Sequence, residues 1–158
     1  MKFSLAAFVM LCGSVIPLAR ADAISCPDLS AAVQVAACPT EEDLRFTFNG
    51  YCSDNARIYS KDADVCTDFQ LYRKLKNVAL WESGDGEFQA YVSCDLPVAG
   101  VKAAKASGIS VSRKAGITRL VCTYGEGLVF TNRTRLECSV DEKANCSADP
   151  SGCKATCE

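Results

Sequence analysis

The chain has 158 residues, 23% of them charged, and its 17 basic residues are nearly balanced by 19 acidic ones. This balance does not favour nucleic acid as the partner. The sequence contains no histidine, which excludes Ser-His-Asp and Cys-His catalytic sites, histidine-assisted ribonuclease chemistry and most zinc catalysis.

Residues 1–21 have the features of a secretory signal peptide. Lys2 supplies the positive start, an apolar run follows over Phe3–Leu18, and the next three residues have the small-x-small pattern of a cleavage site. Cleavage after Ala21 is favoured over a competing site after Ala23. A membrane anchor is the alternative, but the run is short and ends at a cleavage-like pattern.

Removal of this segment leaves 137 residues with 15 basic and 19 acidic side chains, a net charge of −4. That length is enough to bury a core. No later stretch is long and apolar enough to span a bilayer. We therefore expect a soluble, secreted, extracellular protein that is monomeric and needs no cofactor.

Ten cysteines follow the signal segment. Their even number and the oxidising compartment predict five disulfides, with the connectivity left open. A Cys52–Cys66 bond is the favoured single pairing, because it would close a polar loop of 15 residues and contribute about 3 kcal/mol on the loop-entropy model. Without histidine or a CxxC pair, no metal site is expected. The ten are Cys26, Cys38, Cys52, Cys66, Cys94, Cys122, Cys138, Cys146, Cys153 and Cys157.

The first elements of the mature chain are expected to be a helix and a strand. Asp28 can cap a helix over Leu29–Cys38 that ends at Pro39. Residues 40–43 look like a second helix start, but Leu44–Phe48 alternates apolar and polar residues and so favours a strand.

The segment Thr67–Asn77 fits two periodicities. A short helix capped by Thr67 or Asp68 is favoured over an alternating strand.

A hairpin is predicted over Val78–Cys94, with a two-residue turn at Asp85-Gly86. In this register Trp81 faces Ala90, and one face of the ribbon is consistently apolar. The other face is polar, with two large exceptions, Leu80 and Tyr91. The apolar face collects Ala79, Trp81, Phe88, Ala90, Val92 and Cys94.

A second hairpin is predicted after a short helical stretch at Pro97–Ser107 and a strand at Ile109–Ser112. Its arms are joined by a three-residue loop in which Gly127 takes the left-handed conformation. Only this loop length places Cys122 opposite Phe130. The resulting apolar face consists of Leu120, Cys122, Tyr124, Leu128 and Phe130.

The sequence thus predicts an α+β fold: an N-terminal helix and short further helices packed on a twisted antiparallel sheet of four to six strands. Residues 22–138 form the single domain, and the cysteine-rich tail 139–158 is too poor in apolar residues to fold without disulfides. The expected inward side chains are Leu29, Val33, Phe46, Phe48, Trp81, Phe88, Ala90, Val92, Leu120, Tyr124 and Phe130.

Three groups of side chains are candidates for function. A basic group suits a phosphate, a sulfated glycan or an acidic partner, or else an ordinary solvated face or edge protection. Acids at the hairpin tips either keep the protein soluble or form a glycosidase-type pair. Asn132-Arg133-Thr134 is an N-glycosylation pattern, although strand parity turns Asn132 inward. The basic group is Lys102, Lys105, Arg113, Lys114, Arg119, Arg133 and Arg135, and the acids are Glu82, Asp85, Glu87 and Glu126.

The signal segment, the ten cysteines and the blocks WESGDGEFQAYVSC and TRLVCTYGEGLVFTNRTRLEC together resemble small secreted cysteine-rich effector proteins of plant-pathogenic fungi. The resemblance is one of class and carries over no binding or catalytic residue. It implies a non-enzymatic virulence protein that acts outside the producing cell, in the host apoplast, on host components. The partner is then expected to be a host protein or, given the basic group, an anionic glycan or lipid surface. The alternatives are a hydrolase inhibitor, an antimicrobial or toxin-like protein and, less favoured, a carboxylate-based hydrolase.

Overall fold

The computed structural model describes residues 22–140, 146 and 152–158. The predicted signal segment therefore lies outside the described residues, as does much of the predicted tail. The described chain is α+β, with two antiparallel sheets and five disulfides.

The larger sheet has six strands in the order β2-β3-β4-β7-β6-β5, and the smaller has three in the order β1-β9-β8. The strands are β1 (Asp22–Ser25), β2 (Val33–Gln34), β3 (Val78–Glu82), β4 (Gln89–Ser93), β5 (Ala106–Lys114), β6 (Ile117–Tyr124), β7 (Val129–Thr134), β8 (Cys138–Val140) and β9 (Lys154–Cys157). The helices are α1 (Glu41–Tyr51), α2 (Ala63–Thr67), α3 (Phe69–Lys76) and α4 (Val98–Ala103), with short helical turns η1 (Leu29–Ala31), η2 (Arg57–Lys61) and η3 (Gly125–Gly127).

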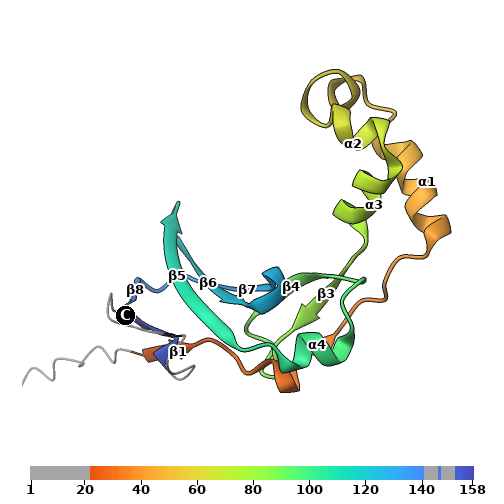
Figure 1. The fold of residues 1–158 in the computed structure, drawn as a ribbon. Helices are drawn as coiled ribbons and strands as arrows, with labels where there is room; N and C mark the ends of the chain where they lie inside the picture. The colour runs from red at the N-terminus through yellow and green to blue at the C-terminus, as the bar shows by residue number, and fades with distance from the viewer. Residues whose placement is uncertain (1–21, 141–145, 147–151) are drawn as a thin grey trace, which may run out of the picture.

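The core lies on one face of the six-stranded sheet. Trp81, Phe88 and Phe130 point into it from β3–β4 and β7, and Val101 of α4, Leu29 of η1 and side chains of the small sheet cover them. Figure 1 shows β1 beneath β5–β7, β8 beside β5, and α4 beneath β3. One face of the large sheet is therefore covered.

Residues 40–77 form a separate unit, here named the helical arm, which contains α1, η2, α2 and α3. Figure 1 shows it projecting away from both sheets. It has its own aromatic cluster, in which the ring of Phe48 lies 5.2 Å from that of Tyr72 and 5.5 Å from that of Phe69. The expectation that all helices pack on the sheet is therefore wrong, because these helices bury their apolar side chains against one another.

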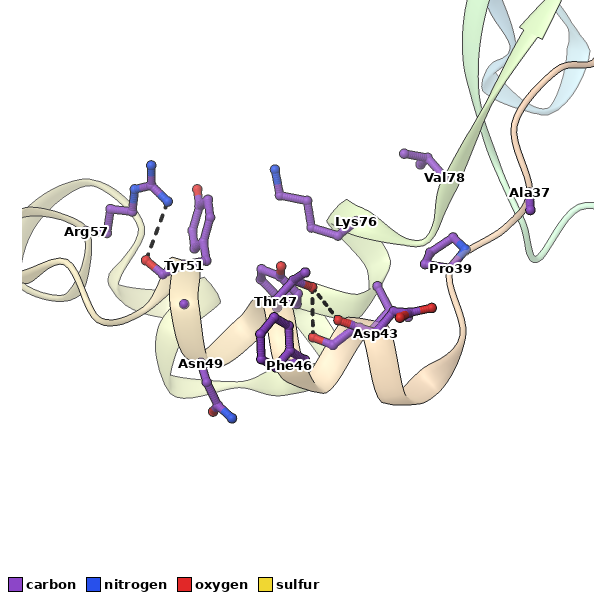
Figure 2. Close-up of a pocket in the computed structure, with 13 residues that line it drawn as sticks. Ala37, Pro39, Asp43, Phe46, Thr47, Asn49, Tyr51, Arg57, Lys76 and Val78 are labelled. Carbon is purple, nitrogen blue, oxygen red and sulfur yellow. Dashed lines mark hydrogen bonds between the residues drawn. The ribbon is translucent and has the colours of Figure 1, made fainter.

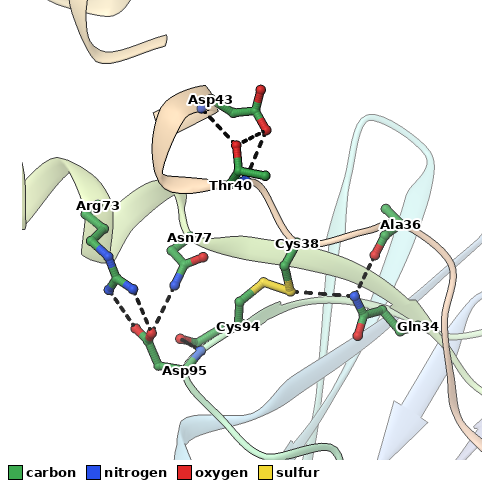
Figure 3. Close-up of a disulfide and its surroundings, with 10 residues drawn as sticks. Gln34, Ala36, Cys38, Thr40, Asp43, Arg73, Asn77, Cys94 and Asp95 are labelled. Atoms are coloured by element: carbon green, nitrogen blue, oxygen red, sulfur yellow. Dashed lines mark hydrogen bonds and ion pairs between the residues drawn. A yellow bond between two sulfur atoms is a disulfide. The ribbon is translucent and has the colours of Figure 1, made fainter. Parts of the chain in front are cut away.

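The base of the arm is attached to the sheet by a disulfide and a polar cluster (Figure 3). Cys38, just before α1, is bonded to Cys94 at the end of β4. Arg73 of α3 donates two hydrogen bonds to Asp95, at 3.2 and 3.3 Å, and the buried Asn77 donates a third at 3.0 Å. These contacts determine how the arm leaves the sheet.

The predicted N-terminal helix is not formed. Asp28 does cap a helical turn by accepting a 2.9 Å hydrogen bond from the Ser30 N–H, but the turn ends at Ala31. The chain then extends as β2 and pairs with β3, placing Val33 opposite Glu82. Val33 is 48% exposed rather than inward. The segment is extended rather than helical because the open edge of β3 offers backbone partners that a helix would not use.

The predicted strand at Leu44–Phe48 is instead part of α1. Thr40 and Asp43 form a reciprocal capping box that starts the helix. Leu44, Phe48 and Tyr51 then follow at helical spacing and face α3, so the alternation was a misleading signal. Phe46 points outward and is 80% exposed, and Phe48 is half-buried within the arm rather than under the sheet.

The registers of both predicted hairpins are confirmed. Trp81 pairs with Ala90 and Cys122 with Phe130. Gly127 has a φ of 71°, as the three-residue loop requires. The first turn differs in detail: the Gly86 N–H donates to the Ser83 carbonyl at 2.8 Å, so the turn is centred one residue earlier than predicted, with the register unchanged.

The predicted helix over Thr67–Asn77 is confirmed as α3, capped by Asp68. The helical stretch before the second hairpin is confirmed as α4, but it ends earlier than expected and β5 already begins at Ala106.

The five disulfides use all ten predicted cysteines. Cys52–Cys66 is confirmed and joins the two ends of the segment between α1 and α2. One bond, Cys146–Cys153, lies within the predicted tail, and Cys138–Cys157 joins the tail to the last residue of the predicted domain. The strand β9 pairs with both β8 and β1. The remaining pairs are Cys26–Cys122, Cys38–Cys94, Cys138–Cys157 and Cys146–Cys153.

Candidate functional site

The candidate site is the second face of the six-stranded sheet, here named the open face. Strand alternation that buries Leu120 and Cys122 turns their neighbours Arg119 and Val121 to this side. Tyr91 of β4 is the large side chain most exposed on it, at 77%. No helix of the described chain is seen lying over this face in Figure 1.

Two arginines face each other at one end of the open face. Arg119 of β6 pairs directly with Arg133 of β7, which places their Cβ atoms about 4.5–5.5 Å apart. Both are exposed, and neither has a carboxylate within 4.0 Å among the described residues. Like charges directly opposite each other destabilise a sheet, so this pair does not itself stabilise the fold.

A hollow of about 340 Å³ lies beside the two arginines. Its opposite end is apolar, with Leu80 and the ring of Tyr91. Its middle is polar: the Thr131 hydroxyl donates to the Gln89 carbonyl at 3.2 Å, and the Gln89 amide donates to Glu82 at 3.1 Å. The hollow thus combines a cationic end, hydrogen-bonding groups and an aromatic surface.

The predicted basic group is only partly brought together. Lys114 shares the open face with the two arginines, since it is opposite Ile117 in the β5–β6 register. Arg113 points to the other side and pairs with Glu137 at 3.1 Å, and Lys105 lies 3.9 Å from Asp28. Lys102 lies on α4, and Arg135 follows the end of β7.

Two of the acids at the hairpin tips are engaged in hydrogen bonds with neighbouring groups. Asp85 accepts hydrogen bonds from the Ser83 hydroxyl and from the Glu87 N–H at 3.0 Å, and these hold its pKa below the usual range. A glycosidase acid needs a raised pKa. Glu82 is hydrogen-bonded to Gln89, and Glu126 lies in η3 on the other hairpin.

The glycosylation pattern falls on a buried side chain. Asn132 is opposite Leu120 on the inward face, and its amide nitrogen donates to the Glu87 carbonyl at 3.1 Å. A glycan on that nitrogen would require the side chain to leave the core. This geometry argues against modification of the folded chain at this position.

A second hollow is an open groove of about 900 Å³ on the helical arm (Figure 2). Tyr51 stands between two cations: the Arg57 guanidinium is 4.0 Å and the Lys76 ammonium 5.0 Å from its ring centre. The Tyr51 hydroxyl donates to Asp62 at 2.8 Å, which raises the pKa of this tyrosine. Because Tyr51 and Arg57 already have acidic or aromatic partners, the positive charge in the groove is less available to a ligand than that of the arginines on the open face.

Sequence reasoning identified the two arginines but not the residues around them. Tyr91 and Leu80 were recognised as large apolar members of an otherwise polar face, and that mismatch was the available signal. Gln89 and Thr131 gave no signal, because only the single β4–β7 pairing brings them together.

No cluster of three or more potential metal-ligating side chains occurs within residues 22–140, 146 and 152–158. Among the helices that the structure describes, none has the length and apolar character needed to cross a bilayer.

No protein-family model, curated protein or solved structure matches the chain.

Proposed function

We propose that this chain is a secreted, non-enzymatic effector-type protein that acts by binding an anionic host target on its open face. The observation that carries the proposal is the pair Arg119 and Arg133, exposed and without an acidic partner in the described chain. Guanidinium groups form strong, directional hydrogen bonds to carboxylate, sulfate and phosphate groups.

The covalent framework supports a binding role. Cys122, on the inward side of β6, is bonded to Cys26, so the strand that carries Arg119 is fixed to the N-terminal segment. A surface held rigid in this way loses little conformational entropy when a partner binds.

The absence of histidine from the sequence and the low pKa of Asp85 both favour binding over hydrolysis. A glycoside-hydrolysing activity that disappears in Asp85→Asn or Glu82→Gln would contradict the non-enzymatic proposal.

The test is a pull-down from host extracellular fluid with the secreted, oxidised protein. Arg119→Gln/Arg133→Gln should lose the captured partner. Lys74→Gln/Lys154→Gln is the matched control, because it removes the same charge at exposed positions outside the open face. Equal capture by both variants would contradict the proposed binding surface.

A hydrolase inhibitor is the second candidate, and one observation favours it. Tyr59 is 80% exposed within the segment closed by Cys52–Cys66, and an aromatic side chain on a covalently closed loop suits insertion into an enzyme pocket. Inhibition of a host hydrolase that is lost in Tyr59→Ala but kept in Arg119→Gln/Arg133→Gln would select this candidate.

A further inference from the structure

We infer that the open face is a site for an acidic glycan, in which one sulfate or carboxylate group lies between Arg119 and Arg133 and a sugar ring lies on Tyr91. This inference rests on the proposed function and names its ligand class. It follows from the order of the groups across the hollow and from the pairing of its strands.

The anionic end is defined by the cross-strand pair. With Cβ atoms about 4.5–5.5 Å apart, both guanidinium groups can donate to one anionic group, and a shared anion removes their mutual repulsion. Lys114 is the diagonal neighbour of Arg119 on the same face, so a second acidic group on the same ligand would meet a third cation.

The other end suits the ring of a sugar. Tyr91 presents an exposed aromatic ring with a polar tip, next to Leu80, its direct partner across β3 and β4. Between the two ends, the Thr131 hydroxyl has already donated to Gln89, so its lone pairs are left to accept from a ligand hydroxyl. Apolar contact with a few fixed polar groups is typical of small-ligand sites, and about 340 Å³ is within their range.

A peptide fits this position less well. The hollow lies over the strands β4, β7 and β6, which all have neighbours on both sides in the sheet. At the Gln89–Thr131 pair and along β6, the backbone edges are therefore occupied and are not free for an acidic peptide to add as a strand. Recognition must occur through side chains that rise from the sheet surface.

The test is calorimetric titration of the oxidised protein with oligosaccharides of matched length: a heparin-derived sulfated one, an oligogalacturonate and a neutral cello-oligosaccharide. Inorganic sulfate and a poly-glutamate peptide complete the set. We expect one or both acidic oligosaccharides to bind, and to bind more weakly at high salt. Comparison of the affinities for the sulfated and the carboxylated oligosaccharide shows which acidic group is preferred. The neutral oligosaccharide should bind at least about tenfold more weakly.

The variants separate the two ends of the site. Arg119→Gln/Arg133→Gln should weaken binding of the acidic oligosaccharide by more than about tenfold, and Tyr91→Ala should weaken it while leaving binding of inorganic sulfate unchanged. The control Lys74→Gln/Lys154→Gln should bind like the wild type. Trp81 fluorescence checks that each variant is folded.

Four results would overturn the inference: no binding of either acidic oligosaccharide, equal affinity for inorganic sulfate, equal affinity for poly-glutamate, or no effect of Tyr91→Ala. If a host protein is captured through the two arginines while no acidic oligosaccharide binds, the glycan assignment fails and the proposed function survives. If the arginine variant still captures every partner, the proposed function fails as well.

Discussion

Arg119 and Arg133 illustrate, at the level of single residues, how the proposed binding function and stability can oppose each other. Their direct opposition on β6 and β7 is unfavourable. Arg133→Glu turns the pair into an attractive one and should raise the free energy of unfolding by roughly 0.2–1 kcal/mol. Urea unfolding followed by the fluorescence of Trp81, the only tryptophan, measures this change, and anion binding should be lost in the same variant.

The double variant Arg119→Glu/Arg133→Glu is the control for this prediction. It restores a like-charged pair, so the gain should disappear. A gain that persists in the double variant would show that the stabilisation does not come from the attraction within the pair.

Trp81 is the residue whose removal should damage the fold most directly. It is 4% exposed and lies in the core cluster with Phe88 and Phe130. Trp81→Ala should lower the free energy of unfolding by about 3–5 kcal/mol, measured by far-UV circular dichroism in urea. Tyr91→Ala, on the opposite face, should change it by no more than about 0.5 kcal/mol; a loss under about 1 kcal/mol for Trp81 would contradict its burial.

The helical arm and the sheets should behave as different elements in solution. The Cys52–Cys66 bond closes a loop within the arm, and the arm buries Leu44 and Tyr72 internally. Cys52→Ser/Cys66→Ser should therefore destabilise the arm by about 3 kcal/mol on the loop-entropy model. The rate of hydrogen exchange in α1–α3 should rise, while the unfolding transition of the sheets, followed by the fluorescence of Trp81, stays unchanged.

Cys26→Ser/Cys122→Ser is the comparison for this experiment, because Cys122 is completely buried in the sheet core. This variant should shift the Trp81 transition. If the arm disulfide shifts that transition equally, the arm and the sheets unfold together.

The attachment of the arm should depend on pH. The guanidinium of Arg73, with further help from Asn77, holds the pKa of Asp95 below its usual range. A depressed pKa contributes stability that is present above the unfolded-state value of about 3.9, and that stability is lost as the pH falls through the folded-state pKa. Unfolding measured from pH 6 downward should show this loss, and Asp95→Asn should show less of it.

At the scale of the whole molecule, the chain is predicted to be exported, cleaved and completely oxidised. Cleavage after Ala21 keeps all four residues of β1, whereas cleavage after Ala23 would remove two residues paired with Cys157 and Thr156. Mass spectrometry of the secreted protein should give an N-terminus at Asp22 and ten cysteines without free thiols. Free thiols at most of these positions would contradict the covalent framework.

Local patterns in the sequence determined the parts of the fold whose partners are close along the chain. The two hairpins, the helix α3 and the Cys52–Cys66 bond are of this kind, because alternation, turn residues and short spacing define a unique partner. The two arginines of the candidate site also followed from strand parity. The helix α1 was missed because alternating residues at Leu44–Phe48 outweighed a capping box that was present in the sequence.

Only the tertiary structure decided which distant segments meet. Several features depend on residues that are far apart in the chain. They are the Cys26–Cys122 and Cys38–Cys94 bonds, the contact between β4 and β7, the extension of the expected first helix as β2, and the separation of the arm from the sheet. Local propensity cannot rank such pairings, because each depends on which surfaces remain uncovered once the nearer elements have packed. The open face exists for the same reason: the sequence placed two arginines on one side of a strand, but only the packing of η1, α4 and the small sheet on the opposite face left them accessible.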